Sequence, residues 1–234
     1  MSHQDAAEAL RHDRHLLERS GTAERVAGIL RQRITEGVFL PGTRLSEPAI
    51  STALGVSRNT LRESFQLLAH ERLAIHELNR GVFVRELTAD DIGDLYAVRR
   101  LVECGAVRRA AELKNIDLTA VGQGVADGLR AAAVDDWPAA GTASMCFHQA
   151  VADLAASERV STTMRQVLAE TRLFFVVTEN TRRFFEPYVA RHHKIMKHLE
   201  RKRFDLAEQA LDRYLRDAEK QLLLAYRCRG TPAV

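Results

Sequence analysis

Three short helices are predicted in the first third of the chain. Apolar side chains recur there three, four or seven residues apart, a spacing that places them on one face of a helix. Ser46 and Ser57 mark helix starts, because a serine side chain caps free backbone amides, and Gly37 and Gly55 mark helix ends. The three apolar stripes consist of Val26, Ile29, Leu30 and Ile34, then Ile50, Ala53 and Leu54, and finally Leu61, Phe65 and Leu68.

Short runs of alternating polar and apolar residues follow the third helix. They are LAIHE at 73–77 and VFVRE at 82–86, separated by Leu78, Asn79, Arg80 and Gly81. This pattern is typical of a β-hairpin. Three helices followed by a hairpin form a winged helix-turn-helix, which we assign to residues 21–87, after a mobile or weakly helical N-terminal extension at residues 1–20.

The rest of the chain has helical spacing throughout. Thr88 can cap a new helix, and the acidic residues that follow it stabilise a helix N-terminus. About six helices are expected, over residues 89–114, 117–134, 138–156, 158–180, 184–203 and 204–228. The predicted fold class is therefore mainly α, with an N-terminal winged helix-turn-helix and a C-terminal all-helical bundle at residues 88–230 that binds an effector and dimerises.

The composition is that of a soluble globular protein. The chain of 234 residues is 46% hydrophobic and 28% charged, and it is long enough for two domains. No run approaches the roughly 18 apolar residues of a membrane span, and the N-terminus lacks the apolar core of a signal peptide, so we expect a cytoplasmic protein. Cys104, Cys146 and Cys228 form no CxxC pair, which argues against a disulfide framework and a structural zinc site; we expect them to be reduced and buried.

Polar side chains gather at the start of the third predicted helix. They are Ser57, Arg58, Asn59, Thr60 and Arg62. In a helix-turn-helix, the first residues of the recognition helix enter the major groove of DNA. An arginine such as Arg58 presents two parallel donors that match guanine O6 and N7. An ordinary capped, solvent-exposed helix would carry similar residues, but the surrounding winged helix-turn-helix pattern favours DNA binding.

Three motifs in this region resemble the N-terminal domain of the GntR family of bacterial transcription regulators. They are PGTRLSE at 41–47, LGVSRNTLRE at 54–63 and NRGVFV at 79–84. The resemblance implies a homodimer bound to double-stranded operator DNA. It also implies DNA contacts from Arg44, Ser57, Arg58, Asn59, Thr60 and Arg62, and a wing tip near the minor groove formed by Asn79, Arg80 and Gly81.

The helical part resembles the FCD effector domain of the FadR-type branch of that family. The resemblance is carried by DIGDLYAVRRLVECGAVRRAA at 91–111, CFHQAVADLAAS at 146–157 and RHHKIMKHLERKRFDLAEQALDRYL at 191–215. Many members of that branch hold a divalent metal with one aspartate and three histidines. Here His148 and His192 match two of those positions, but Ser144 and Tyr214 occupy the others, and hydroxyl groups are poor zinc ligands. No cofactor is expected; a bound metal, if present, would be held by His148 and His192.

An effector acid that binds without a metal needs a cationic side chain. Arg99 is the strongest candidate, because its apolar neighbours place it close to the buried side of its helix, where a cation needs an anionic partner. These neighbours are Leu95, Val98, Leu101 and Val102. Alternatively, the histidines are hydrogen-bonded core residues and the arginines form ordinary ion pairs on helix faces. The predicted effector site comprises Arg99, Ser144, His148, Arg172, His192 and Tyr214.

Together the two resemblances imply an effector-responsive transcription regulator, a repressor that a small organic acid releases from a palindromic operator. One alternative is a DNA-binding regulator whose helical domain has lost its ligand and only dimerises. Another is an enzyme with a cleft containing Cys146, His148 and His192, but no arrangement of nucleophile, base and orienting group can be read from the sequence, so no enzyme is expected. The sequence identifies neither the operator nor the effector nor the regulated genes.

Overall fold

The computed structural model describes residues 14–175 and 181–229. The chain divides into two compact units. One comprises the chain up to Glu86 together with a short stretch that begins at Arg172, and the other begins at Leu87. Within the described ranges, no helix is long and apolar enough to cross a membrane.

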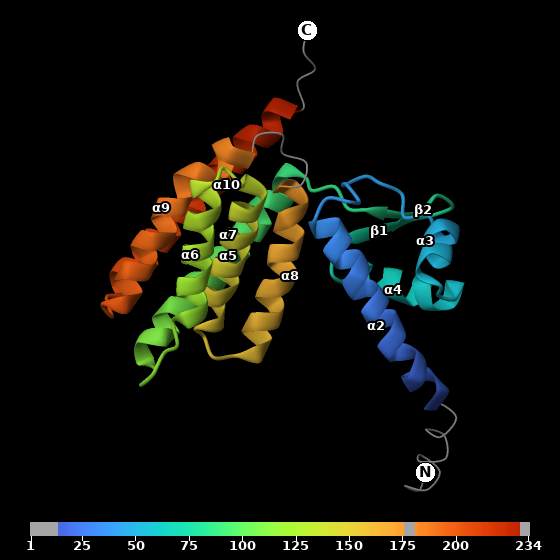
Figure 1. The fold of residues 1–234 in the computed structure, drawn as a ribbon, viewed down its shortest axis with the longest axis horizontal. Coiled ribbons are helices and arrows are strands. Elements are labelled where there is room, and N and C mark those ends of the chain that lie inside the picture. Colours follow the sequence, from blue (N-terminus) through green and yellow to red (C-terminus); the bar gives the residue numbers. More distant parts are fainter. Residues whose placement is uncertain (1–13, 176–180, 230–234) are drawn as a thin grey trace, which may run out of the picture. The chain divides into compact units, whose positions relative to one another are not determined.

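The N-terminal unit contains helices and a two-stranded antiparallel sheet (Figure 1). Both α2 and α3 pack against α4. The first of these helices begins earlier than predicted, so residues 14–20 of the expected extension are helical, and residues 1–13 lie outside the described ranges. The elements are α2 (Arg14–Thr35), α3 (Glu47–Leu54), α4 (Arg58–His70), β1 (Ala74–Glu77) and β2 (Gly81–Val84).

The apolar stripes of α2 and α4 form the core of this unit, but Ile29, predicted to belong to the stripe of α2, is 45% exposed. Ile34 from α2, with Leu61 and Leu68 from α4, is fully buried. The short helix α3 buries Ile50 but leaves Ala53 exposed. The prediction that Ala53 belongs to the buried side of this helix was therefore wrong. An eight-residue helix turns only about twice; Ile50 is the buried residue of α3, and Leu54 is half-buried.

A third extended segment, which the sequence pattern did not reveal, runs along the hairpin. The backbone N–H of Leu45 donates to the Val82 carbonyl at 2.8 Å, and that of Gly42 donates to the Val84 carbonyl at 2.9 Å. The segment from Gly42 to Leu45 therefore pairs with β2. This pairing places Arg44 beside the wing, although 34 or more residues separate it in sequence from the predicted tip at residues 79–81.

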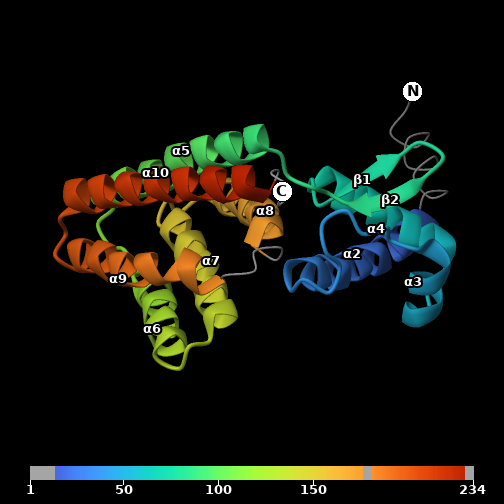
Figure 2. The same ribbon diagram turned by 90° about the horizontal axis from the view of Figure 1, so that it is seen from above.

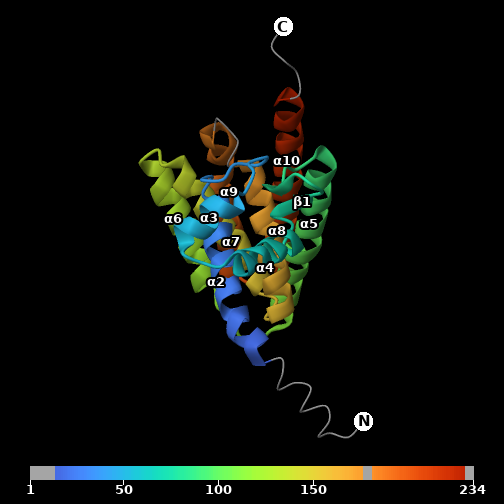
Figure 3. The ribbon, with the colours of Figure 1, turned by 90° about the vertical axis from the view of Figure 1, so that its right-hand side faces the viewer.

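The C-terminal unit is helical in its described part. The six predicted helices are present, with their ends shifted by a few residues, and residues 176–180 of the fourth predicted helix lie outside the described ranges. Helices α5 and α10 lie side by side along their length (Figures 2 and 3). The helices are α5 (Ala89–Glu112), α6 (Thr119–Ala133), α7 (Trp137–Asp153), α8 (Glu158–Phe175), α9 (Thr181–Glu200) and α10 (Phe204–Arg229).

Helices α6 and α7 approach each other closely at Gly124. A Cβ atom at this position would lie 2.9 Å from the backbone N and Cα of Phe147, so the approach requires glycine. Phe147 is fully buried and precedes His148. The close packing therefore fixes the part of α7 that carries the candidate effector residues.

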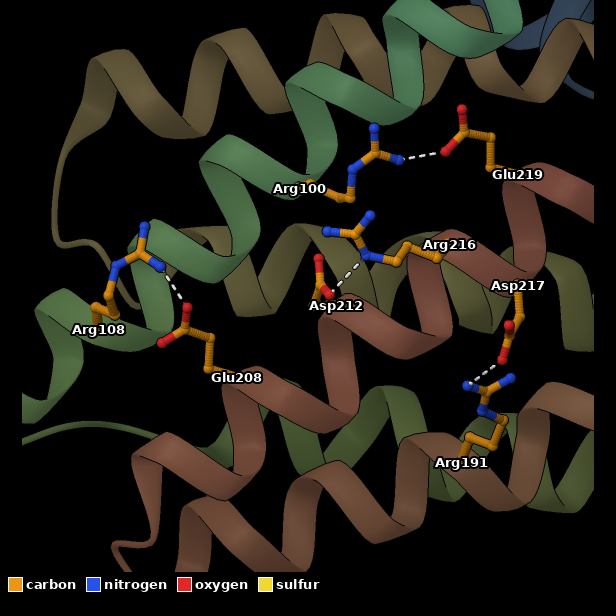
Figure 4. Close-up of polar contacts among 8 residues, drawn as sticks. All are labelled: Arg100, Arg108, Arg191, Glu208, Asp212, Arg216, Asp217 and Glu219. Carbon is orange, nitrogen blue, oxygen red and sulfur yellow. Dashed lines mark hydrogen bonds and ion pairs between the residues drawn. The ribbon is translucent and has the colours of Figure 1, made fainter.

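Ion pairs tie α10 to its two neighbours in the helical unit. They link α5 to α10 on one side and α9 to α10 on the other (Figure 4). Because most of these side chains are partly exposed, each pair contributes only about 0–1 kcal/mol to stability. The pairs are Arg100–Glu219, Arg108–Glu208 and Arg191–Asp217, the last at 2.9 Å.

Candidate functional site

The first turn of α4 exposes polar residues that were expected to contact DNA. Ser57 caps the helix, because its Oγ accepts a hydrogen bond from the Thr60 backbone N–H at 3.1 Å. Arg58 and Asn59 are exposed, whereas Leu61 is fully buried. The turn is thus anchored through Leu61 and presents its polar side chains to solvent.

The two arginines of α4 differ in their partners. Arg62 donates from Nε to the carboxylate of Glu47, with distances of 3.2 and 3.1 Å to the two oxygens. In the described part of the chain, no acidic side chain forms an ion pair with Arg58. Glu47 therefore orients Arg62 along the surface, while the guanidinium of Arg58 is available to an external acceptor.

The wing tip brings a second group of predicted DNA-binding residues together. Asn79 and Gly81 have φ angles of 61° and 111°, which turn the chain between the strands. A Cβ on Gly81 would lie 3.2 Å from Arg44 Nε, so the glycine admits the arginine beside it. Arg80 is exposed and forms an ion pair with Glu77. Arg44 and the wing tip therefore form one cationic surface.

Five of the predicted effector residues meet in the interior of the helical unit, together with Glu103. None of the six side chains is more than 4% exposed. Buried polar groups in this number require hydrogen-bond partners or a ligand. We call the set the buried polar cluster; it consists of Arg99 and Glu103 from α5, Ser144 and His148 from α7, His192 from α9 and Tyr214 from α10.

Glu103 joins two other members of the buried polar cluster. Its Oε1 accepts a hydrogen bond from Arg99 Nε at 2.8 Å, and its Oε2 lies 2.6 Å from His148 Nδ1. Glu103 was not among the predicted site residues. Its position four residues after Arg99 on a helix was the signal that could have identified it, because such pairs face each other.

The charges of the cluster follow from burial and from these contacts. Burial opposes the charge of Glu103, but the facing His148 and Arg99 outweigh burial and lower the pKa of its carboxyl. Burial lowers the pKa of His148 against the opposing effect of Glu103, and burial lowers the pKa of His192 well below its usual value. At neutral pH the cluster therefore holds an ionised Glu103 and two uncharged imidazoles.

Aromatic rings surround the two histidines. Phe147 stacks on His192 with ring centroids 4.2 Å apart, and the His148 ring lies 5.3 Å from that of His192. The Tyr214 ring is 4.9 Å from His148 and 5.0 Å from His192. Burial raises the pKa of Tyr214, which keeps its hydroxyl protonated. The rings thus form an apolar wall around the polar atoms and exclude bulk water.

Four polar atoms of the buried polar cluster lack a hydrogen-bond partner among the described residues. Ser144 Oγ lies near the Tyr214 hydroxyl and favours its charged form, but the geometry falls short of a hydrogen bond. A buried polar atom without a partner costs about 1–3 kcal/mol, and a molecule that satisfied several of these atoms would recover that cost. The four atoms are Arg99 Nη2, Ser144 Oγ, His148 Nε2 and His192 Nε2.

The donor set of the cluster does not fit a resident metal ion. Across residues 14–175 and 181–229, no group of three or more His, Cys, Asp or Glu side chains could hold one. Glu103 uses one oxygen for Arg99 and the other for His148. The remaining groups near the two imidazoles are the hydroxyls of Ser144 and Tyr214, which are poor ligands for zinc.

The structure places Cys146 at the surface and groups Arg172 with the N-terminal unit. Cys104 is buried as expected, but Cys146 is exposed, so the prediction of burial was wrong for Cys146. The reason is that His148, two residues further on α7, faces the core, and neighbours at that spacing point in different directions. Arg172 groups with the N-terminal unit and not with the buried polar cluster. Arg191, beside His192, pairs with Asp217 (Figure 4).

Two family models match the chain. The model described as "Bacterial regulatory proteins, gntR family" matches residues 22–84, and the model described as "FCD domain" matches residues 94–217. The two matches cover the winged and the helical parts of the chain. The expected fold class, a winged helix-turn-helix followed by a helical domain, is confirmed.

Curated relatives are similar over part of their length. The gluconate operon transcriptional repressor of Bacillus licheniformis is 38% identical over 101 residues, which are 43% of this chain and 41% of the relative. The HTH-type transcriptional repressor RspR of Escherichia coli is 33% identical over 90 residues, which are 38% of this chain and 40% of the relative. The matched region thus spans about two fifths of these relatives.

Solved structures match over nearly the whole chain. A GntR transcriptional regulator from Rhodococcus sp. RHA1 is 48% identical with a TM-score of 0.82, covering 87% of this chain and 98% of that protein. E. coli McbR/YncC has a TM-score of 0.75 at 17% identity, covering 88% of this chain and 98% of that one. The second likeness concerns the fold alone.

Proposed function

Because the chain belongs to the GntR family of bacterial transcription regulators and carries an FCD domain, we propose that it represses transcription from a palindromic operator and leaves that operator when a small organic acid binds the helical unit. The observation that carries the DNA-binding part is the capped first turn of α4, which exposes Arg58 without an acidic partner among the described residues. The buried polar cluster supports the effector part.

Repression and dimerisation are supported by different arguments. Two curated relatives are named as repressors, although the similarity to each covers about two fifths of its length. A single winged unit places one recognition helix in one major groove and reads few base pairs, so useful specificity requires two copies on a symmetric site. A homodimer therefore accounts for a palindromic operator.

The effector acts on DNA binding through a shared equilibrium. If the acid binds the DNA-free conformation more tightly, it lowers operator affinity by the same factor by which the operator lowers acid affinity. A regulator whose helical unit only dimerises would show no such coupling. Thermal stabilisation by an acid, together with release of bound operator, distinguishes these two functions.

The experiment for DNA recognition compares Arg58→Ala with Arg44→Ala. An operator is first selected from random duplex DNA with the wild-type protein, and each variant then competes on single-base operator variants. We expect Arg58→Ala to lose about 1–3 kcal/mol and to relax the preference at one base pair, because arginine reads guanine through two bonds. Arg44→Ala should weaken all sequences alike. Unchanged affinity and base preference in Arg58→Ala would remove this residue from the interface.

A further inference from the structure

The free atoms of the buried polar cluster have defined hydrogen-bond roles. Arg99 Nη2 can only donate, since a guanidinium has no acceptor. Glu103 carries one negative charge, and its hydrogen bond with Arg99 already balances that charge. A second cation at His148, which is 0% exposed, would therefore be uncompensated, so this imidazole is uncharged.

The contact between His148 and Glu103 fixes the tautomer of the histidine. An ionised carboxylate can only accept, so the proton lies on Nδ1, which is 2.6 Å from Glu103 Oε2. In a neutral imidazole the other nitrogen is then an acceptor. His148 Nε2, buried and without a partner among the described residues, therefore requires a donor. Arg99 thus offers a free donor and His148 a free acceptor.

The free acceptor of His148, and not the charge balance, argues against recognition of a plain carboxylate. Arg99 and Glu103 together carry no net charge, so an acid entering the cluster gains a directional bond from Arg99 Nη2 but no excess positive charge. An acid without a donor would also leave His148 Nε2 unsatisfied. A hydroxyl group supplies this donor.

We propose that the effector is a hydroxy acid, whose carboxylate accepts from Arg99 Nη2 and whose hydroxyl group donates to His148 Nε2, without a metal ion. This inference rests on the proposed function, since it specifies the class of acid that the helical unit binds. Ser144 Oγ and His192 Nε2 are further free polar atoms of the same cluster and can bond additional hydroxyl groups.

The test uses acids that share a carbon skeleton and differ in their hydroxyl groups. Wild-type protein is titrated calorimetrically, with a chelator throughout, against both enantiomers of lactate and malate, against gluconate, and against 3-hydroxybutyrate. The matched probes are propionate, succinate, hexanoate and butyrate, which lack the hydroxyl, and 2-fluoropropionate and fluorosuccinate, in which fluorine fills similar space but cannot donate. We expect the best hydroxy acid to bind about 5- to 150-fold more tightly than its deoxy and fluoro counterparts, because they leave a buried acceptor unsatisfied.

A variant pair assigns this preference to His148. In His148→Asn the side-chain amide can keep the donor to Glu103 but has no atom at the position of Nε2, so the preference for the hydroxy acid should fall to about onefold. His193→Asn, on the exposed side of α9, is the matched control and should retain the wild-type preference. If His148→Asn does not fold, the comparison of probes on the wild-type protein still decides the question.

Release of the selected operator, measured in parallel, distinguishes a failure of the hydroxy-acid inference from a failure of the proposed function. If a deoxy or fluoro acid binds as tightly as its hydroxy counterpart and releases the operator, the hydroxyl contact is refuted while the proposed function stands. Binding that needs added zinc would refute the metal-free site. If no acid of the panel binds although the operator does, both the hydroxy acid and the effector part of the proposed function are wrong.

Discussion

Replacing Glu103 with glutamine would remove a buried negative charge with almost no change in shape. The wild-type carboxylate accepts from Arg99 Nε at 2.8 Å and contacts His148 Nδ1 at 2.6 Å. Glutamine provides one carbonyl oxygen and an amide group that can only donate. At most one of the two contacts can persist unchanged, and the charge of Arg99, which is 1% exposed, loses its counterion.

The expected loss of stability follows from this burial. Removing one partner of a buried ion pair costs about 3–5 kcal/mol, because the other charge stays buried without compensation. His148 can change its tautomer and accept from the new amide, which recovers part of the loss and favours the lower end, about 3 kcal/mol. Glu208→Gln is the matched control, since Glu208 pairs with Arg108 on the surface of the same unit, where an ion pair is worth about 0–1 kcal/mol.

Urea unfolding monitored by tryptophan fluorescence measures the difference. The chain has a single tryptophan, Trp137, which is 8% exposed at the start of α7, so its signal reports the unfolding of the helical unit. The midpoint for Glu103→Gln should fall well below that of Glu208→Gln, with a similar dependence on urea concentration. If both variants lose the same free energy of unfolding, Glu103 is not a buried counterion, and the charge balance assigned to the cluster is wrong.

Two further predictions concern packing and thiol chemistry. Gly124→Ala should destabilise the helical unit by about 1–3 kcal/mol, because the new Cβ would lie 2.9 Å from the backbone of Phe147. Gly21→Ala is the helical control, since no atom lies within 4 Å of its new Cβ, and it should be neutral or stabilise its unit by up to about 1 kcal/mol. Thermal unfolding followed by circular dichroism measures both variants. In a variant in which Cys228 is replaced, a thiol reagent at pH 9 should label the exposed Cys146 of the folded protein but not the buried Cys104. Burial raises the pKa of the Cys104 thiol to about 12, so this thiol stays protonated at pH 9. Labelling of both cysteines at equal rates would contradict the burial of Cys104.

Local patterns predicted the winged unit well because its helices and hairpin are set by neighbouring residues. Ser57 caps α4 through a contact three residues away, and the hairpin pairs within a short stretch. The edge segment around Arg44 was missed because it pairs with residues about 40 positions later. Its own run of residues does not alternate, and backbone pairing over such a separation depends on the tertiary fold.

The residues proposed to bind the effector were likewise only partly predictable from local patterns. Leu95, Val98 and Val102 on α5 correctly indicated that Arg99 faces inward, but Leu101, which was counted with them, is 74% exposed. A spacing of four residues placed Ser144 and His148 on one side of α7. The sequence could not separate Arg172 from the members of the buried polar cluster, because helical periodicity shows which residues share a face but not which helices meet. In the structure Arg172 groups with the N-terminal unit.

The proposed ligand would account for the presence of a charged cluster in this core. A buried ion pair is weak evidence for stability, since apolar residues of similar volume are often equally good or better. Here the cost is larger, because four polar atoms in the same cluster remain without partners among the described residues, each worth about 1–3 kcal/mol. A core selected for stability alone would lose this free energy for no gain. A ligand that donates to His148 and accepts from Arg99 recovers it on binding, and the surplus becomes the affinity that can shift the DNA-binding equilibrium.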